Sequence, residues 1–349
     1  MREEARECFR QCKFIKALEL FEQILGHSQH GLEDQKIAST WDLSYYRCES
    51  EKINELTKAL CKNTTLTSLD LKNNELGSGE VKVFANALCK NTTLTSLDLS
   101  WNELGPEEGK NLADALCKNT TLTSLNLYVN NLGSEGGKAL ADALYKNTTL
   151  TSLDLWDNNL GSEGGRALAD ALRKNTTLKI LNLGYNKLGL EGGKALADAL
   201  RKSIFRFKNT MLVSLDLGYN NFGSEGGKAL ADALCKNTTL TFLNLSYNKL
   251  GSEGGIALAD ALCKNTTVTI LNLSSNNIGS EGGKELANAL CKNTTLISLD
   301  LKNNELELGG GKALADALCK NVTLTSLDIQ YNNINFIVKS NNPSIEILQ

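Results

Sequence analysis

The amino-acid sequence predicts an α/β solenoid, in which one strand–turn–helix–turn unit repeats and stacks on copies of itself. Two observations predict this class. One frame, L-x-x-L-x-L-x-x-N-x-[L/I/F], occurs ten times between Leu66 and Ile334, and it recurs every 28 residues except at one place. The segments between frames are also alike, as in G-S-E-G-G-K-A-L-A-D-A-L at 133–144. A fixed period of this length is the sequence signature of a repeat architecture.

The ten frames define the predicted repeat region, residues 66–338. They begin at Leu66, Leu94, Leu122, Leu150, Leu178, Leu212, Leu240, Val268, Leu296 and Leu324. Between Leu178 and Leu212 the step is 34 residues, which places a six-residue insertion at 203–208. A contact role for this apolar and basic insertion and a neutral insertion both remain open.

Within each repeat, the frame predicts a strand and the following segment predicts a helix. Leu69 and Leu71 alternate with polar Ser68 and Asp70, the period of a strand that buries one side. In the segment 133–144, apolar residues recur at helical spacing after a glycine-rich turn, with Ser134 as the expected N-cap. One repeat cannot cover its own leucines, so we expect neighbouring repeats to stack.

Stacking predicts a right-handed α/β horseshoe with a parallel sheet on the concave face and helices on the convex face. The curvature follows because adjacent strands lie about 4.8 Å apart, whereas packed helices need about 8–10 Å.

The asparagine at the ninth place of each frame is predicted to be structural. Its amide group can both donate and accept hydrogen bonds where the backbone turns away from the strand. The row comprises Asn74, Asn102, Asn130, Asn158, Asn186, Asn220, Asn248, Asn276, Asn304 and Asn332. We expect a buried ladder rather than a functional site.

These motifs resemble the leucine-rich repeat, and the 28-residue length with L-G-S-E-G-G-K-A-L-A-D-A-L between strands resembles its ribonuclease-inhibitor-like subclass. The resemblance covers about four fifths of the chain. Members of the subclass include inhibitors, the sensing arrays of NOD-like receptors and the Ran GTPase-activating protein. The resemblance therefore implies a protein that binds other proteins.

The two ends depart from the repeat. Residues 1–33 resemble a single tetratricopeptide hairpin, which we expect to cap the stack. Residues 34–65 read as a degenerate first repeat, with Trp41, Leu43 and Cys48 one period before the corresponding positions of the first full frame and a helix at 53–60. Residues 339–349 read as a truncated repeat whose segment 345–348 resembles a strand start. An uncovered apolar end there would favour self-association.

Composition argues against several classes of function. Charged residues make up 22% of the chain and the net charge is −3, so neither a nucleic-acid footprint nor a basic membrane patch is visible. No stretch approaches a membrane span, and the N-terminal residues lack the apolar segment of a signal peptide. The sequence therefore predicts a cytoplasmic protein with no nucleic-acid or membrane partner.

No pattern in the chain supports catalysis, a cofactor or a metal. Seven of the ten cysteines occupy one repeat position after the helix, and we expect free, partly buried thiols. The segment 133–139 is one residue short of a phosphate loop and ends in alanine instead of a hydroxyl residue. His27 and His30 lie in a polar linker without further ligands at suitable spacing. Asn-Thr-Thr after each helix is interpreted as a C-terminal cap rather than a glycosylation site.

Function is predicted where the repeats differ, mainly at exposed places of the frame on the concave face. Aromatic residues gather at the seventh and eighth places, apolar residues at the third, and Asp or Asn at the fifth. Trp and Tyr with a polar surround are typical of protein interfaces. The candidate protein-binding residues are Trp101, Tyr128, Trp156, Ile180, Tyr185, Asp216, Tyr219, Phe242, Tyr247 and Tyr331.

Three interpretations of this face remain open. The first is a non-enzymatic scaffold that binds a protein partner, to which the carboxylate row would steer a basic surface. The second is a GTPase activator similar to the Ran activator, with a small GTPase as partner, although the strongly acidic tail of that family is missing here. The third is a sensing fragment of a NOD-like receptor type innate immune protein. As a structural alternative, the tyrosines merely cover neighbouring repeats.

Overall fold

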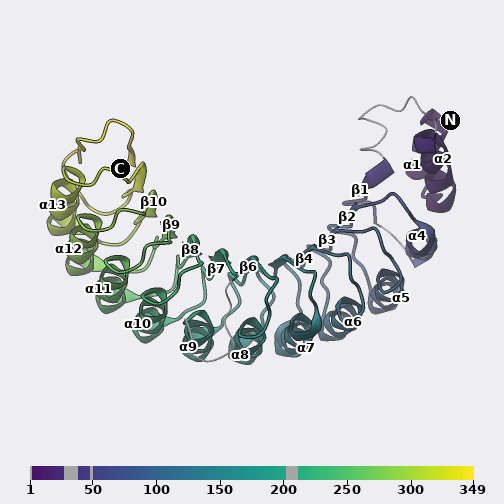
Figure 1. Ribbon diagram of the computed structural model, residues 1–349, viewed down its shortest axis with the longest axis horizontal. Coiled ribbons are helices and arrows are strands. Elements are labelled where there is room, and N and C mark those ends of the chain that lie inside the picture. The colour runs from purple at the N-terminus through teal and green to yellow at the C-terminus, as the bar shows by residue number, and fades with distance from the viewer. Residues whose placement is uncertain (1, 27–37, 48–49, 202–210) are drawn as a thin grey trace. The chain divides into compact units, whose positions relative to one another are not determined.

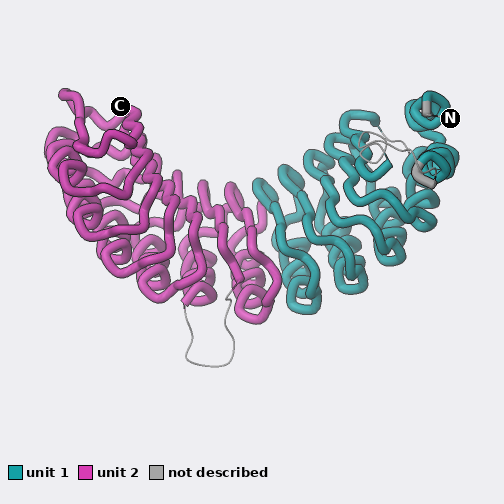
Figure 2. The backbone as a smooth tube through the Cα atoms, turned by 45° about the horizontal axis from the view of Figure 1, so that its top comes forward, with its two compact units in different colours: residues 1–158 teal, residues 159–349 magenta. Residues whose placement is uncertain are grey.

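The computed structural model describes residues 2–26, 38–47, 50–201 and 211–349 (Figure 1). The expected insertion at 203–208, His27, His30 and Cys48 lie outside the described residues. The chain forms two compact units, 1–158 (unit 1) and 159–349 (unit 2), shown in different colours in Figure 2. Each unit is described by itself.

Unit 1 opens with two helices and continues with alternating strands and helices. Its elements are α1 (Arg2–Arg10), α2 (Phe14–Gly26), β1 (Thr40–Asp42), α4 (Ser50–Lys62), β2 (Ser68–Asp70), α5 (Ser78–Leu88), β3 (Ser96–Asp98), α6 (Pro106–Leu116), β4 (Ser124–Asn126), α7 (Gly133–Lys146) and β5 (Ser152–Asp154). Strands β1 to β5 pair in parallel, each with the next in sequence.

Unit 2 repeats the same order without an opening helix pair. Its elements are α8 (Gly161–Leu172), β6 (Ile180–Asn182), α9 (Gly189–Leu200), β7 (Ser214–Asp216), α10 (Gly223–Leu234), β8 (Phe242–Asn244), α11 (Gly251–Leu262), β9 (Ile270–Asn272), α12 (Gly279–Leu290), β10 (Ser298–Asp300), α13 (Glu307–Leu318), β11 (Ser326–Asp328) and β12 (Glu346–Leu348). Strands β6 to β12 are likewise parallel neighbours.

The predicted fold class, an α/β solenoid of parallel strands and helices, is confirmed. In each unit the strands line one side and the helices cover the other (Figure 1). We call the strand side, formed by the polar places of the strands and the loops that follow them, the strand face. Leu69 and Leu71 are buried between strand and helix, as are their equivalents in later repeats. In β1, Trp41 takes the place of these leucines and pairs with Leu69 in register.

The helix starts differ from expectation, because Ser134 is not an N-cap. No side-chain hydrogen bond caps helix α7. Instead Gly133 adopts φ +59°, and its N–H donates to the carbonyl oxygen of Asn158 in the next repeat over 3.0 Å. Glycine adopts this left-handed conformation without steric cost. The turn is therefore tied by an inter-repeat backbone bond, and Ser134 already lies within the helix.

The paired glycines inside the helices allow close packing between repeats. A Cβ on Gly109 in α6 would lie 3.0 Å from the Cα of Gly136 in α7. A Cβ on Gly193 in α9 would lie 2.7 Å from Cδ1 of Phe222. The glycine-rich segment that resembles a phosphate loop thus serves helix packing in these repeats.

Candidate protein-binding surface

The ninth-place asparagines form the buried ladder that the sequence predicts, as Asn248 illustrates. Its Nδ2 donates to the carbonyl oxygens of Leu217, Leu245 and Ser246 over 2.8, 3.1 and 3.1 Å. Its Oδ1 accepts the N–H of Asn220 over 3.0 Å. The side chain is fully buried and joins adjacent repeats. These residues hold the fold and offer nothing to a partner.

Asn147 of one Asn-Thr-Thr segment is the C-cap of α7, as the sequence predicts, but the sequence reasoning did not foresee that these asparagines form a second buried ladder between repeats. The Nδ2 of Asn147 donates to the carbonyl oxygen of Leu116 over 2.8 Å, and its Oδ1 accepts the N–H groups of Thr149 and Leu150 over 3.0 and 2.7 Å. Asn147 therefore lies at the end of one helix, accepts hydrogen bonds from the residues that lead into the next strand, and joins two repeats. An asparagine recurs at this place in all repeats, and this recurrence is the sequence signal from which the second ladder could have been predicted.

The fifth-place Asp and Asn residues are half-buried and shape the loop after each strand. Oδ1 of Asp216 accepts the N–H of Gly218 over 2.9 Å, and its Oδ2 accepts from Nδ2 of Asn244 over 2.9 Å. In unit 1, Asp70 accepts the N–H of Lys72 over 2.8 Å. Burial, and then the neighbouring carboxylates of Asp98 and Asp42, raise the pKa of Asp70. The row is part of the loop structure as well as a negatively charged strip.

In unit 1 the predicted aromatic residues lie in one run along the strand face. The ring centroids of Trp101 and Tyr128 are 6.1 Å apart. Tyr128 stacks on Trp156 with centroids 4.6 Å apart and planes at 12°. Trp101 is exposed, whereas the other two rings are half-buried.

In unit 2 three tyrosines form a second run, the tyrosine run Tyr185, Tyr219 and Tyr247. The first two rings are tilted with centroids 5.5 Å apart, and the last two stack at 4.0 Å and 11°. The three residues are 43%, 39% and 44% exposed. Burial is the largest cause that raises the pKa of Tyr219, to about 12, with a hydrogen bond to Tyr247 adding to it. At neutral pH the Tyr219 hydroxyl is therefore a protonated donor.

The backbone that carries these rings is in the left-handed region. Trp101, Tyr185, Tyr219, Tyr247 and Tyr331 have φ between 55° and 58°. The same place in other repeats holds Asn73, Val129, Asp157, Ser275 and Asn303, also with positive φ. Non-glycine residues there carry a conformational cost, least for Asn and Asp. The turn therefore does not require an aromatic side chain.

An apolar group lies beside the tyrosine run on strands β6 to β9. Ile180 and Ile270 are exposed and Phe242 is half-buried at the third place of the frame. Val213 and Ile297, at the second place, are also exposed, and the sequence reasoning did not single them out. The corresponding places in the first four repeats hold only Thr and Ser. Unit 2 thus presents apolar side chains where unit 1 presents hydroxyl groups.

Tyr331, the last of the predicted residues, stands apart from the tyrosine run. It is 73% exposed, and the ammonium group of Lys302 lies 5.0 Å from its ring centroid. No stacked aromatic neighbour is recorded for Tyr331 among the described residues. Its position adds a cation–π contact rather than extending the stack.

The nine cysteines among the described residues are free, but most of them are exposed and not partly buried as expected. Cys61, Cys117, Cys263, Cys291 and Cys319 are exposed, while Cys89 and Cys235 are half-buried. The place lies at or just past the helix end, where the side chain faces outward. In the described part of the chain, no three His, Cys, Asp or Glu side chains are grouped to hold a metal ion. None of its described helices has the length and apolar character needed to cross a bilayer.

Comparisons with known proteins agree with this geometry. The family model described as Leucine Rich repeat matches residues 62–79, 90–113, 118–141, 146–169, 174–197, 208–231, 236–259, 264–287, 292–315 and 320–335. No curated protein matches the chain.

Among solved structures, the leucine-rich repeat-containing protein LegL7 from Legionella pneumophila is similar, with TM-score 0.50 and 23% identity over 88% of this chain and 89% of that one. The Rad7 and Elc1 complex in yeast matches with TM-score 0.42 and 17% identity over 99% of this chain and 94% of that one. The tropomodulin C-terminal domain of Caenorhabditis elegans matches with TM-score 0.38 and 15% identity over 42% and 90%. With the family model covering more than half of the residues, this chain belongs to the leucine-rich repeat family.

Proposed function

We propose that this protein is a non-enzymatic scaffold that binds a protein partner on its strand face. Leucine-rich repeat domains generally serve protein–protein interaction, which gives the broad class. The observation that carries the proposal is the tyrosine run, above all the exposed stack of Tyr219 on Tyr247.

The tyrosine side chains are better suited to binding a partner than to stabilising the fold. Their backbone has positive φ, where Tyr is less favourable than the Asn or Asp found in other repeats. Their rings remain about two fifths exposed, so much of their apolar area is not removed from water. Rigid aromatic side chains with a polar tip supply much contact area at little entropic cost, and they dominate binding energy at interfaces.

The neighbouring apolar side chains define where the partner would lie. Ile180, Phe242 and Ile270 lie on β6, β8 and β9, and the tyrosine run follows β6, β7 and β8. Between them runs the polar fifth place, including Asp216. An apolar group with aromatic anchors and hydrogen-bonding groups is the composition expected of an interface core. We therefore place the main contact on unit 2.

Charge favours a partner with a basic surface. On unit 1, Asp42, Asp70 and Asp98 lie in register on adjacent strands. Like charges directly opposite each other destabilise a sheet, and basic side chains brought by a partner would relieve this repulsion. The effect would increase the association rate at low ionic strength more than the affinity.

The experiment is affinity capture from a lysate of the source organism, read by quantitative mass spectrometry. The bait variant replaces the tyrosine run with serine (Tyr185→Ser, Tyr219→Ser, Tyr247→Ser). A matched control replaces exposed apolar residues on the helix side, Tyr145→Ser in α7 and Ile256→Ser in α11. We expect a protein that the wild type and the control retain and the tyrosine variant loses.

Equal capture by all three proteins would contradict the proposal. So would a large loss of thermal stability confined to the tyrosine variant, because it would show that the rings serve packing. Repeating the capture of the identified protein at increasing salt tests the electrostatic contribution, since surface attraction weakens as the Debye length shortens.

A further inference from the structure

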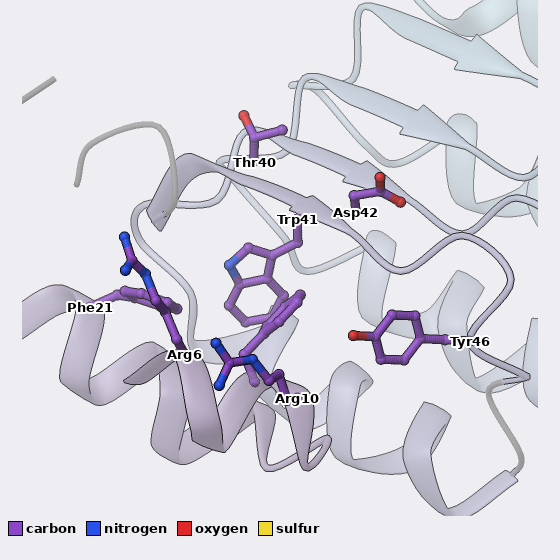
Figure 3. Close-up of a pocket in the computed structure, with 8 residues that line it drawn as sticks. Arg6, Arg10, Phe21, Thr40, Trp41, Asp42 and Tyr46 are labelled. Carbon is purple, nitrogen blue, oxygen red and sulfur yellow. The ribbon is translucent and has the colours of Figure 1, made fainter. Parts of the chain in front are cut away.

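A cavity of about 320 Å³ lies in unit 1 between the opening helices and the first strand. It is lined mainly by Arg6, Phe9 and Arg10 from α1, Phe21 from α2, Trp41 from β1, and Tyr46. Its volume falls in the range of small-molecule sites, about 300–1,000 Å³. Figure 3 shows Arg6, Arg10 and Phe21 on the helix side and Trp41 extending toward them from β1.

The cavity has an aromatic floor. The ring of Phe9 meets the Trp41 indole edge to face, with centroids 5.3 Å apart and planes at 66°. The ring of Phe14 also lies beside the indole, with centroids 5.8 Å apart. Trp41 is 2% exposed and Phe21 is also buried. These walls are held by packing, so the apolar part of the site is already formed.

One polar group in this floor lacks a partner. The Nε1 of Trp41 is buried and makes no hydrogen bond. Figure 3 shows this nitrogen directed toward the side on which the Arg6 side chain lies. A buried donor without an acceptor is unfavourable and uncommon. An acceptor atom on a bound molecule would satisfy it.

Two arginine side chains lie at the rim of the cavity, and each is paired with glutamate. Arg10 pairs with Glu7 at 2.9 Å and with Glu3 at 3.4 Å, and Arg6 lies 3.8 Å from Glu3. These pairs are solvent-exposed, so water screens them and they can exchange partners. The one acid in the lining, Asp42, is held by the N–H and hydroxyl of Ser44 over 3.0 and 2.6 Å. Figure 3 shows Asp42 on the opposite side of the indole from Arg6.

We propose that this cavity binds a compact amphipathic anion, namely a carboxylate carried on an aromatic or branched aliphatic group. The carboxylate accepts the Trp41 Nε1–H and faces Arg6, and the apolar group lies against Phe9 and Phe21. A hydrogen bond between an uncharged donor and a carboxylate is stronger than one between neutral groups. This site shares no residue with the tyrosine run and does not require the proposed partner.

The test uses Trp41 as its own reporter. The chain has three tryptophans, so Trp101→Phe combined with Trp156→Phe leaves Trp41 as the only indole. The probe is 3-phenylpropionate, and its neutral counterpart is 3-phenylpropanol. We expect a saturable change in Trp41 fluorescence and a shift of its indole N–H resonance, with the carboxylate bound about tenfold more tightly than the alcohol.

Two variants examine the charge without disturbing the core. Arg6→Gln should weaken binding of the carboxylate about tenfold and leave binding of the alcohol unchanged. Arg166→Gln in α8, an exposed arginine outside the cavity, serves as the matched control and should change neither. Equal affinity for both probes, or the same result with Arg6→Gln as with Arg166→Gln, would overturn the anion assignment. The absence of any saturable signal at Trp41 would overturn the site itself.

Discussion

The phenol rings of Tyr219 and Tyr247 stack with centroids 4.0 Å apart and planes at 11°, although both residues are exposed and both have positive φ. An aromatic pair typically contributes about 0.5–1.5 kcal/mol beyond the area that it buries, and a face-to-face arrangement is less favourable than an offset or edge-to-face one. The left-handed backbone costs a similar amount for residues other than glycine. The stack therefore gives the isolated protein little net stability, which is consistent with a role in binding.

The first prediction concerns these two residues in the absence of a partner. The double substitution Tyr219→Asn and Tyr247→Asn removes the stack but introduces a residue that, among those other than glycine, is well suited to positive φ. The free energy of unfolding should change by less than about 1 kcal/mol. Chemical denaturation measures it. A loss of several kcal/mol would show that the rings act as packing residues and would weaken the binding proposal.

The second prediction concerns the buried asparagine ladder. Asn248→Ala removes three donated hydrogen bonds and the acceptor for the N–H of Asn220. Several buried backbone groups then lack a partner, so we expect a loss of about 2–4 kcal/mol of unfolding free energy. Lys249→Ala, at the next, exposed position, is the matched control and should change stability by less than about 0.5 kcal/mol. Similar values for both variants would refute the structural role of the ladder.

The third prediction concerns close helix packing. Gly193→Ala places a methyl group 2.7 Å from Cδ1 of the buried Phe222, so the helices must separate. We expect destabilisation by about 1–3 kcal/mol despite the better helix propensity of alanine. Gly79→Ala in α5 meets no atom within 4 Å and should instead stabilise by about 0.5–1 kcal/mol. The melting temperatures of both variants test this prediction. An equal increase in melting temperature for the two variants would rule out the packing constraint at Gly193.

Much of the fold could be predicted from the sequence because the repeat imposes the same local solution many times. Leu69 and Leu71 alternate with polar residues, and Asn74 follows at a fixed distance, so strand, core and ladder were all visible. The helix start was not, because the bond from Gly133 to Asn158 joins two repeats. Hydrogen bonds between repeats cannot be predicted from the pattern of apolar and polar residues within one repeat.

The sequence predicts which positions of the repeat form the candidate surface, but it does not predict how their side chains contact one another. The sequence indicates that Tyr219 and Tyr247 occupy equivalent places, but their stacking depends on the loop backbone, and the positive φ there is unexpected for tyrosine. The cavity beside Trp41 was hidden for another reason. It forms between α1, α2 and β1, where no repeat pattern relates the residues, so only the folded chain brings Arg6 near the indole.

The fourth prediction concerns the carboxylate row of unit 1. Burial first, and then repulsion from Asp98 and Asp42, raise the pKa of Asp70 above its usual value. The folded state therefore binds this proton more tightly than the unfolded state does, so ionised Asp70 lowers stability at neutral pH. That penalty is complete above the folded-state pKa and disappears as pH falls to the unfolded value, about 3.9.

Asp70→Asn removes the charge but keeps an acceptor for the N–H of Lys72, as Asn126 already does for Tyr128 in another repeat. We expect the variant to melt at a higher temperature than the wild type at neutral pH, and the difference to vanish at about pH 3. Asp114→Asn, on the exposed side of α6, removes an equal charge away from the row and is the matched control. If the Asp70 variant melts lower than the wild type at neutral pH, the hydrogen bond from Lys72 outweighs the repulsion. The argument that a basic partner relieves strain in this row would then fail, because the row would already be favourable in the free protein.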